Sequence, residues 1–440
     1  MDSRFRGNDN GRKERSSFMS ALKPFAAVFY NKEKVENLGE IFCPPYDVIS
    51  QEQQEAYYKQ DPYNFIRLEL PKETPKDNDK DNKYMRARKT YEEWFKKGIF
   101  KQDDSPCVYF YKQDYKYQGQ KYTRMGFLGL LKITEDSGVR ILPHEHTHAA
   151  AKTDRLAIWS ILKANLSPIF VGYADKAGKI DRIFLKELAD RPKPYLEAVD
   201  HDRVKHTIWR LENPDSIRGI GNVIDGQNLF ICDGHHRFEV ADQIRREALK
   251  KAKKTTGEES YNYVMTYFTN MDSKDLQIFP IHRIVKKFPI SVNLLEQYFR
   301  IDKIKTKVDW LVLLARAGQN EHAFGLYNKQ GMFLLRLKNK MLIDKMVKEG
   351  SRDYRSLDAA ILKAFILDQV GVADEDIVYS IDPDEVLQAV NELSAEAGFI
   401  LNPVQVAELR SIALNDERMP PKTTYFYPKV LSGLTIYKMD

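Results

Sequence analysis

The sequence has little of what marks a secreted or membrane protein. It contains 3 cysteines among 440 residues, at positions 43, 107 and 232, and none of them has Cys-x-x-Cys spacing. Such sparse thiols exclude a disulfide scaffold and are typical of a reducing compartment. No apolar run approaches the roughly 18 residues that cross a bilayer, and the N-terminus is polar where a signal peptide has its apolar core. We therefore expect a cytoplasmic protein with no membrane partner.

Charge and the common nucleotide motifs are also weak. The formal net charge of +6 is too small to indicate a nucleic-acid partner. In Gly172 to Lys179 (GYADKAGK), five residues separate the glycines where a P-loop has four, and Ile180 replaces the Ser or Thr that binds magnesium. Gly219-Ile220-Gly221 lacks the third glycine of a dinucleotide fingerprint. These departures exclude P-loop and Rossmann sites.

The organisation of the chain indicates a mixed α+β protein. Charged, apolar-poor stretches at 72–83 and 251–260 predict solvated loops. Aromatic and branched residues at 108–111 and 122–133 predict antiparallel strands, while 293–298, 357–369 and 385–397 are typical of helices among short strands. The regular alternation of a doubly wound parallel sheet is missing. Residues 1–18 resemble a translated repetitive DNA element, so we expect a non-native extension and a true start at Met19.

The most informative segment is Asp233-Gly234-His235-His236-Arg237. It follows the apolar run Asn228 to Cys232 and precedes apolar positions at helical spacing, which predicts a strand, a tight turn and a helix. We expect Asp233 at the N-cap and Gly234 in an unusual backbone conformation. Free backbone N–H groups and the positive end of the helix dipole meet there, so the segment is suited to hold a phosphate. The alternative is an ordinary capped helix whose polar side chains bond to local backbone.

A second segment, Pro143 to His148 (PHEHTH), also carries chemistry. It matches His-Glu-x-x-His, in which two imidazoles one helical turn apart bind zinc and the glutamate acts as base. If the segment is extended, His144, His146 and His148 share one face and could gather a metal instead. A solvated polar loop that enters a helix near Thr153 is the third interpretation. No further zinc ligand is identifiable in the sequence.

These segments, in this order, resemble the uncharacterised "domain of unknown function 1015" family. The resemblance spans nearly everything from Met19 onward. The motifs that carry it are Pro44 to Ile49 (PPYDVI), His144-Glu145-x-Thr147 with Asp154-Arg155 behind it, Ser167 to Phe170 (SPIF), Asp233 to Arg237, and Met419 to Lys429 (MPPKTTYFYPK).

A narrower resemblance suggests a function. ADP-dependent free serine kinases, which share the fold of the partition protein ParB and of sulfiredoxin, also carry a His-Glu segment, a helix, a Pro-Ile strand and Asp-Gly-His-His-Arg. The counterparts are His144-Glu145, 153–164, Pro168-Ile169 and 233–237. About sixty residues separate the last two elements, more than in those kinases. The resemblance implies a ParB/sulfiredoxin-like catalytic core at 136–288, between additional α+β regions at 19–135 and 289–440.

The resemblance also implies roles for single residues. Glu145 would orient and deprotonate an acceptor hydroxyl, and Asp233 would hold magnesium or share that task. Gly234, His235, His236 and Arg237 would grip phosphate oxygens at the helix N-terminus. Further cations that could lie near the phosphates, or form surface salt bridges instead, are Arg155, Lys422 and Lys429. No permanently bound cofactor is expected.

The sequence thus predicts a nucleotide-dependent small-molecule kinase that uses ATP or ADP with Mg²⁺, with free serine as the first acceptor. Two alternatives stay open. One is a metal-dependent hydrolase that uses His144, Glu145 and His148. The other is a non-enzymatic, ParB-like nucleotide-binding switch or nucleic-acid adaptor, which the modest charge and the lack of a helix-turn-helix signal disfavour. The oligomeric state is not predictable from the sequence.

Overall fold

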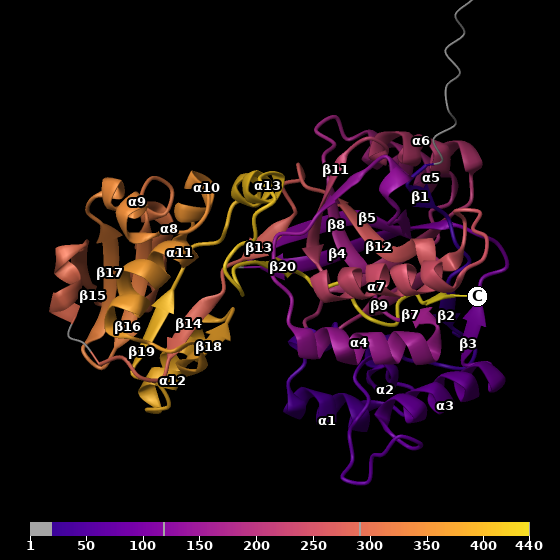
Figure 1. Cartoon of the computed structure of the whole chain (residues 1–440), viewed down its shortest axis with the longest axis horizontal. Helices are drawn as coiled ribbons and strands as arrows, with labels where there is room; N and C mark the ends of the chain where they lie inside the picture. Colours follow the sequence, from indigo (N-terminus) through magenta and orange to yellow (C-terminus); the bar gives the residue numbers. More distant parts are fainter. Residues whose placement is uncertain (1–19, 118, 290–291, 440) are drawn as a thin grey trace, which may run out of the picture.

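The computed structural model describes residues 20–117, 119–289 and 292–439. The expected extension at residues 1–18 and the expected start at Met19 therefore lie outside the described residues. Two lobes lie side by side in Figure 1, each built on its own sheet. Helices and strands occur in both, so the predicted mixed α+β class is confirmed. Within the described ranges, the helices are too short or too polar to cross a bilayer.

A nine-stranded sheet forms the large lobe, with the order β6-β11-β8-β12-β5-β4-β10-β9 and β1 beside β5. Most neighbours are antiparallel, but β8 runs parallel to β12, and β6 runs parallel to β11. The bounds are β1 (Leu22–Lys23), β4 (Val108–Tyr117), β5 (Gln120–Lys132), β6 (Arg140–Leu142), β8 (Ile169–Tyr173), β9 (Leu196–Val199), β10 (Lys205–Leu211), β11 (Asn228–Asp233) and β12 (Tyr263–Asn270). The hairpin predicted from the aromatic runs is the β4–β5 pair.

Both faces of this sheet are covered by other parts of the chain. Since successive side chains of a strand point to opposite faces, neighbouring residues of β4 contact different layers. On β4, Phe110 stacks on Phe184 of α5 (Lys179–Asp190) with ring centroids 4.1 Å apart. Its neighbour Tyr109 packs at 5.3 Å against Phe25 on the other face. The first face is covered by α5, α6 (Pro214–Ile224) and α7 (His235–Lys251). The second is covered by chain from both ends of the protein.

Helices from the N-terminal part complete the large lobe. In Figure 1, α7, α4 (Ala149–Leu162) and α3 (Lys83–Lys96) follow one another in rows, and neighbouring rows are in contact. Shorter elements of this region are β2 (Val28–Tyr30), β3 (Phe100–Gln102), α1 (Gln51–Gln60) and α2 (Ile66–Glu69). The helix expected from residue 153 thus begins four residues earlier, at Ala149.

The small lobe is a six-stranded sheet with the order β15-β17-β16-β19-β14-β18. Its strands are β14 (His282–Val285), β15 (Phe299–Ile304), β16 (Ala323–Asn328), β17 (Gly331–Leu337), β18 (Ile377–Ser380) and β19 (Ala397–Ile400). One face packs on α8 (Lys307–Ala317) and α12 (Pro383–Asn391) around the fully buried Trp310. Short helices line the other face: α9 (Ile343–Met346), α10 (Arg352–Arg355) and α11 (Asp358–Leu362).

After β19 the chain returns to the large lobe. Following α13 (Val406–Leu414), β20 (Tyr425–Tyr427) pairs with β13 (Gln277–Phe279), and β21 (Tyr437–Lys438) pairs with β7 (Ala164–Asn165). The returning stretch 419–439, the C-terminal strap, packs on the large sheet through side chains, for example with the Phe426 ring 5.4 Å from that of Phe170 on β8. The boundary expected after residue 135 falls between β5 and β6, which belong to one sheet. The division into domains stays a prediction.

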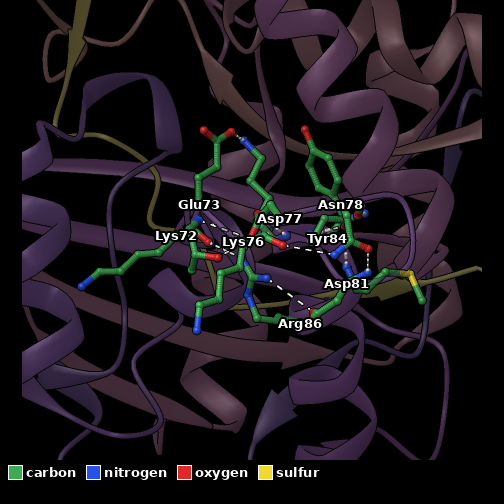
Figure 2. Close-up of polar contacts among 12 residues, drawn as sticks. Lys72, Glu73, Lys76, Asp77, Asn78, Asp81, Tyr84 and Arg86 are labelled. Carbon is green, nitrogen blue, oxygen red and sulfur yellow. Dashed lines mark hydrogen bonds and ion pairs between the residues drawn. The ribbon is translucent and has the colours of Figure 1, made fainter.

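The charged stretch 72–83 is exposed but ordered by its own side chains (Figure 2). The Asp77 carboxylate accepts bonds from the Thr74 hydroxyl at 2.6 Å and from the Arg86 guanidinium at 2.9 Å. Lys83 forms ion pairs with Glu73 and with Asp154 of α4, both at 2.7 Å. This loop is therefore fastened to the N-terminal half of α4, next to the candidate site.

Candidate functional site

The corner at residues 233–237 has the predicted shape with one correction. Asp233 is the last residue of β11, and Gly234 is the N-cap of α7 with φ +85°. The prediction of an Asp233 N-cap was therefore wrong, because Asp233 still belongs to the strand and its carboxylate pairs with the Arg237 side chain instead of capping the helix. Gly234 has no side chain to cap α7, and among the described residues no side-chain cap bond forms there. The backbone N–H groups of its first turn, at the positive end of the dipole, are thus available to an anion.

Asp233 is instead held between two cations. One carboxylate oxygen accepts a bond from Lys429 of the strap, and the other accepts a bond of 2.5 Å from Arg237. Although burial alone would raise it, these two charges hold the pKa of Asp233 well below its usual range. For the Lys429 ammonium the effects are reversed: burial alone would lower its pKa, but the charge of Asp233 raises it. Each oxygen of Asp233 thus already has one cationic partner, and the expected magnesium role of Asp233 stays a prediction.

Arg237 is buried and committed to the protein. Besides Asp233, it donates to the backbone carbonyl of Pro168, at the start of β8. Its guanidinium lies so close to Gly234 that a Cβ there would be 2.9 Å from Nε. These contacts favour a role in positioning the corner, and the predicted phosphate contact of Arg237 stays a prediction.

The corner meets the His-Glu segment through His235. The His144 backbone N–H donates to Nε2 of the His235 ring at 3.2 Å, so that His235 must carry its proton on Nδ1. The two rings meet edge to face at 4.6 Å. Burial lowers the pKa of His144 to about 4 and that of His235 well below its ordinary value. Both imidazoles are therefore neutral at pH 7.

Glu145 lies against this corner and against the strap. It pairs in parallel with Met419, and one carboxylate oxygen accepts the Lys422 backbone N–H at 3.4 Å. The other oxygen is 3.8 Å from Nδ1 of His235. Burial raises the pKa of Glu145 above its ordinary value, against the lowering effect of Lys422. The structure thus brings together Glu145, Lys422 and the first turn of α7, while their roles in catalysis stay predictions.

His236 closes the other side of the site. Its Nε2 accepts the backbone N–H of His148 at 2.9 Å, and the two rings stack at 6.0 Å. Burial lowers the pKa of His236. Nearby, Glu239 accepts bonds from Thr147 at 2.7 Å and Lys152 at 2.9 Å. These contacts join the N-terminal ends of α4 and α7.

The zinc helix expected as an alternative is not formed. Residues 143–148 are not helical, and His148 is only the N-cap of α4, so His144 and His148 are not one turn apart on a helix. The extended alternative is also wrong, since His144 is buried while His146 and His148 are exposed. Throughout the described ranges, no three His, Cys, Asp or Glu side chains are arranged to hold a metal ion.

Arg155 lies behind the site rather than in it. Its guanidinium donates to Asp154 at 2.6 Å and to the backbone carbonyl of Glu69 at 2.8 Å, and it covers the Tyr46 ring at 3.9 Å. It is 4 % exposed. The structure therefore ties Arg155 into a network that supports α4, and a direct phosphate contact would require these bonds to break.

Two residues beside the site were not among the predicted functional residues. Asp47 lies close enough for its charge to raise the pKa of Lys429 and to oppose the burial that lowers that of His236. Tyr425 has the Lys429 ammonium over its ring at 4.2 Å. Both residues occur in motifs of the family resemblance, PPYDVI and MPPKTTYFYPK, which were the available signal. A cavity of about 490 Å³ adjoins Lys429 between α1, the strap and the β9–β10 turn.

Comparison with known families agrees with this arrangement of motifs. The model described as "Protein of unknown function (DUF1015)" matches residues 22–360. The chain belongs to the DUF1015 family. This match runs from β1 into α11 and therefore includes Glu145 and the corner, while the strap lies beyond it. No curated protein matches the chain.

Solved structures similar to this DUF1015 member include a free serine kinase variant in complex with ADP, at 11% identity and a TM-score of 0.35, covering 68% of this chain and 89% of that one. A conserved hypothetical protein from Pyrococcus furiosus has 12% identity and a TM-score of 0.33, covering 68% and 92%. Truncated SbnI from Staphylococcus aureus has 10% identity and a TM-score of 0.36, covering 69% and 85%. The free serine kinases are the proteins to which the sequence motifs pointed.

Proposed function

We propose that this protein is a nucleotide-dependent small-molecule kinase, with ATP or ADP as phosphate donor and free serine as the first acceptor to test. The observation that carries the proposal is the contact of Glu145 with the corner, 3.8 Å from Nδ1 of His235, beside the uncapped first turn of α7. A carboxylate and an anion-binding helix end are the two parts that phosphoryl transfer needs most.

Glu145 acts on the acceptor in this proposal. Its raised pKa makes it a stronger base than an exposed glutamate. The acceptor O–H gives its proton to the carboxylate while its oxygen bonds to the terminal phosphorus. The bond from that phosphorus to the nucleotide then breaks, so that ATP leaves as ADP, or ADP leaves as AMP.

The first turn of α7 holds the transferring phosphate. Neutral His235 and His236 bear N–H donors, and the backbone N–H groups of the turn add more. Lys422 supplies positive charge beside Glu145. Asp233, Lys429 and Arg237 keep the turn in place through their ion pairs. Magnesium would accompany the nucleotide through its phosphates, with no ligand assigned to this chain.

The decisive experiment screens purified protein with ATP and with ADP against amino acids and polyols, and compares wild type with Glu145→Gln. We expect transfer in the wild type and a loss of at least about 100-fold in the variant, with nucleotide affinity changed by only a few fold. Glu135→Gln, on an exposed turn after β5, serves as the matched control and should keep full activity.

Other outcomes are equally informative. A Glu145→Gln variant with full activity contradicts the proposed base. Nucleotide binding with no turnover of any donor favours a non-enzymatic switch instead. We also propose a cytoplasmic location, supported by the three cysteines, which are all free thiols.

A further inference from the structure

The cavity beside Lys429 is lined by acidic and aromatic side chains. Its lining includes two carboxylates of the β9–β10 turn, Asp200 and Asp202, and the rings of Tyr57, Tyr425 and Tyr427. Among the described residues that line it, Lys429 is the one lysine or arginine, and that ammonium is already paired with Asp233. The net charge that the cavity offers to a ligand is therefore negative.

Asp200 is held in place from behind. His206, fully buried, lies 2.9 Å from one Asp200 oxygen through Nε2, and its Nδ1 lies 2.6 Å from the Tyr111 hydroxyl. The other Asp200 oxygen accepts the backbone N–H of Val204 at 2.8 Å. Such support fixes the direction of a carboxylate as a binding site requires.

Asp202 differs from Asp200, whose two carboxylate oxygens contact His206 and the Val204 backbone N–H. In the part of the chain that the structure describes, no side chain or backbone group forms a hydrogen bond or ion pair with its carboxylate. Asp202 is an exposed residue of the turn, and its pKa is raised by the partial loss of solvent at the cavity wall and by the charge of Asp200, against the lowering effect of His201 and His206. A cation placed between this carboxylate and the tyrosine rings would relieve the repulsion and gain cation–π attraction.

The volume of about 490 Å³ lies within the roughly 300–1,000 Å³ of small-molecule sites. We propose that this cavity binds the acceptor as an amine-bearing alcohol, with its ammonium at Asp202 and its hydroxyl toward Lys429 and the corner. This inference rests on the proposed kinase function. It favours acceptors without a carboxylate over free serine, because an acceptor carboxylate would face two aspartates.

Binding of matched pairs of compounds to the full chain tests the proposal without turnover. Calorimetry with glucosamine and glucose, and with ethanolamine and ethylene glycol, compares a cation with its neutral counterpart. We expect each amine to bind at least about tenfold more tightly than its partner, as a charged hydrogen bond predicts. Serine should bind more weakly than ethanolamine.

Variants then assign the preference to the cavity. Asp202→Asn should abolish the preference for the amine, and Tyr57→Leu should weaken amine binding several fold. Asp79→Asn, in the exposed 72–83 loop, is the control and should keep it. Equal binding of charged and neutral partners, an unchanged preference in Asp202→Asn, or no binding of any amine would overturn the proposal.

The two proposals fail in different ways. Amine binding that depends on Asp202, without phosphate transfer from any donor, would leave the cavity assignment standing and reject the kinase. Phosphate transfer that depends on Glu145, without a preference for amines, would support the kinase and reject the cavity assignment.

Discussion

The backbone N–H of His144 donates to the ring of His235, 91 residues later, at 3.2 Å. This bond works only while His235 is unprotonated on Nε2, since an imidazolium has no acceptor. It therefore makes the junction between the His-Glu segment and the corner sensitive to the protonation of one buried ring. Glu145, the next residue along the chain, is held beside α7 by this junction together with its pairing to Met419 of the strap.

Stability should consequently fall in mild acid. The folded pKa of His144, about 4, and that of His235, lower than its ordinary value, both lie below the roughly 6.5 of an unfolded chain. The unfolded state then binds more protons below pH 6.5, so stability is complete above that pH and is lost as the pH falls toward 4. Each ring contributes up to about 1.4 kcal/mol per pH unit to the slope.

Urea denaturation of wild type and His235→Gln between pH 4 and 7 measures this effect. The free energy of unfolding should depend less steeply on pH in the variant, by up to about 1.4 kcal/mol per pH unit. The reason is that glutamine can still accept the His144 N–H but cannot titrate. His146→Gln, at an exposed neighbour, is the control, since it takes no buried ring from the site. A His235→Gln slope equal to that of wild type would show that this ring is not buried in its neutral form.

The ion pair of Asp233 with Lys429 fixes the strap to the corner, and both side chains are 11% exposed. Asp233→Asn leaves two buried cations without a counter-charge and should lower the free energy of unfolding by about 3–5 kcal/mol. Adding Lys429→Met should recover part of that loss, which a double-mutant cycle measures. The control is Asp416→Asn, in the exposed pair with Arg140, where a change of less than about 1 kcal/mol is expected. Strict additivity of the two buried substitutions would contradict the pairing.

The pattern of apolar residues in the sequence was enough to predict the strands and helices that carry the site. The apolar run before Asp233 and the helical spacing after Arg237 predicted β11 and α7. The aromatic runs likewise predicted the β4–β5 hairpin. Each of these signals lies within one short stretch of sequence and depends on side-chain periodicity, which is a property of the chain itself.

Contacts between distant segments were beyond such reasoning. Lys429 reaches Asp233 across 196 positions, and Arg155 reaches Glu69 across 86. No periodicity encodes which of many lysines or arginines finds a given carboxylate. The sequence therefore presented Arg155 and Lys429 as equivalent cations, whereas the structure puts one in a supporting network and the other beside the cavity.

Substitution of Arg155 separates support from catalysis. Arg155→Lys keeps the charge but cannot reproduce the bonds to Asp154 and to the Glu69 carbonyl, so we expect a loss of about 2–3 kcal/mol in the free energy of unfolding. Nucleotide affinity, measured at a temperature where the variant is fully folded, should change less than about threefold. Arg88→Lys, in an exposed pair with Glu92 on α3, is the matched control and should cost less than about 0.5 kcal/mol. A large loss of affinity in a stable Arg155→Lys protein would restore a phosphate contact for this residue.

Gly234 offers the sharpest test of the corner, because the chain provides a matched glycine. Gly234 and Gly226 both have positive φ, +85° and +77°, but a Cβ at Gly226 would meet nothing within 4 Å, whereas one at Gly234 would lie 2.9 Å from Nε of Arg237. Each substitution by alanine should cost about 1–2 kcal/mol for the left-handed backbone. Gly234→Ala should cost more than Gly226→Ala, because it also displaces the guanidinium from Asp233, and it alone should weaken nucleotide binding. Denaturation curves and nucleotide titrations of the two variants measure both differences, and equal effects would mean that Arg237 does not position the turn.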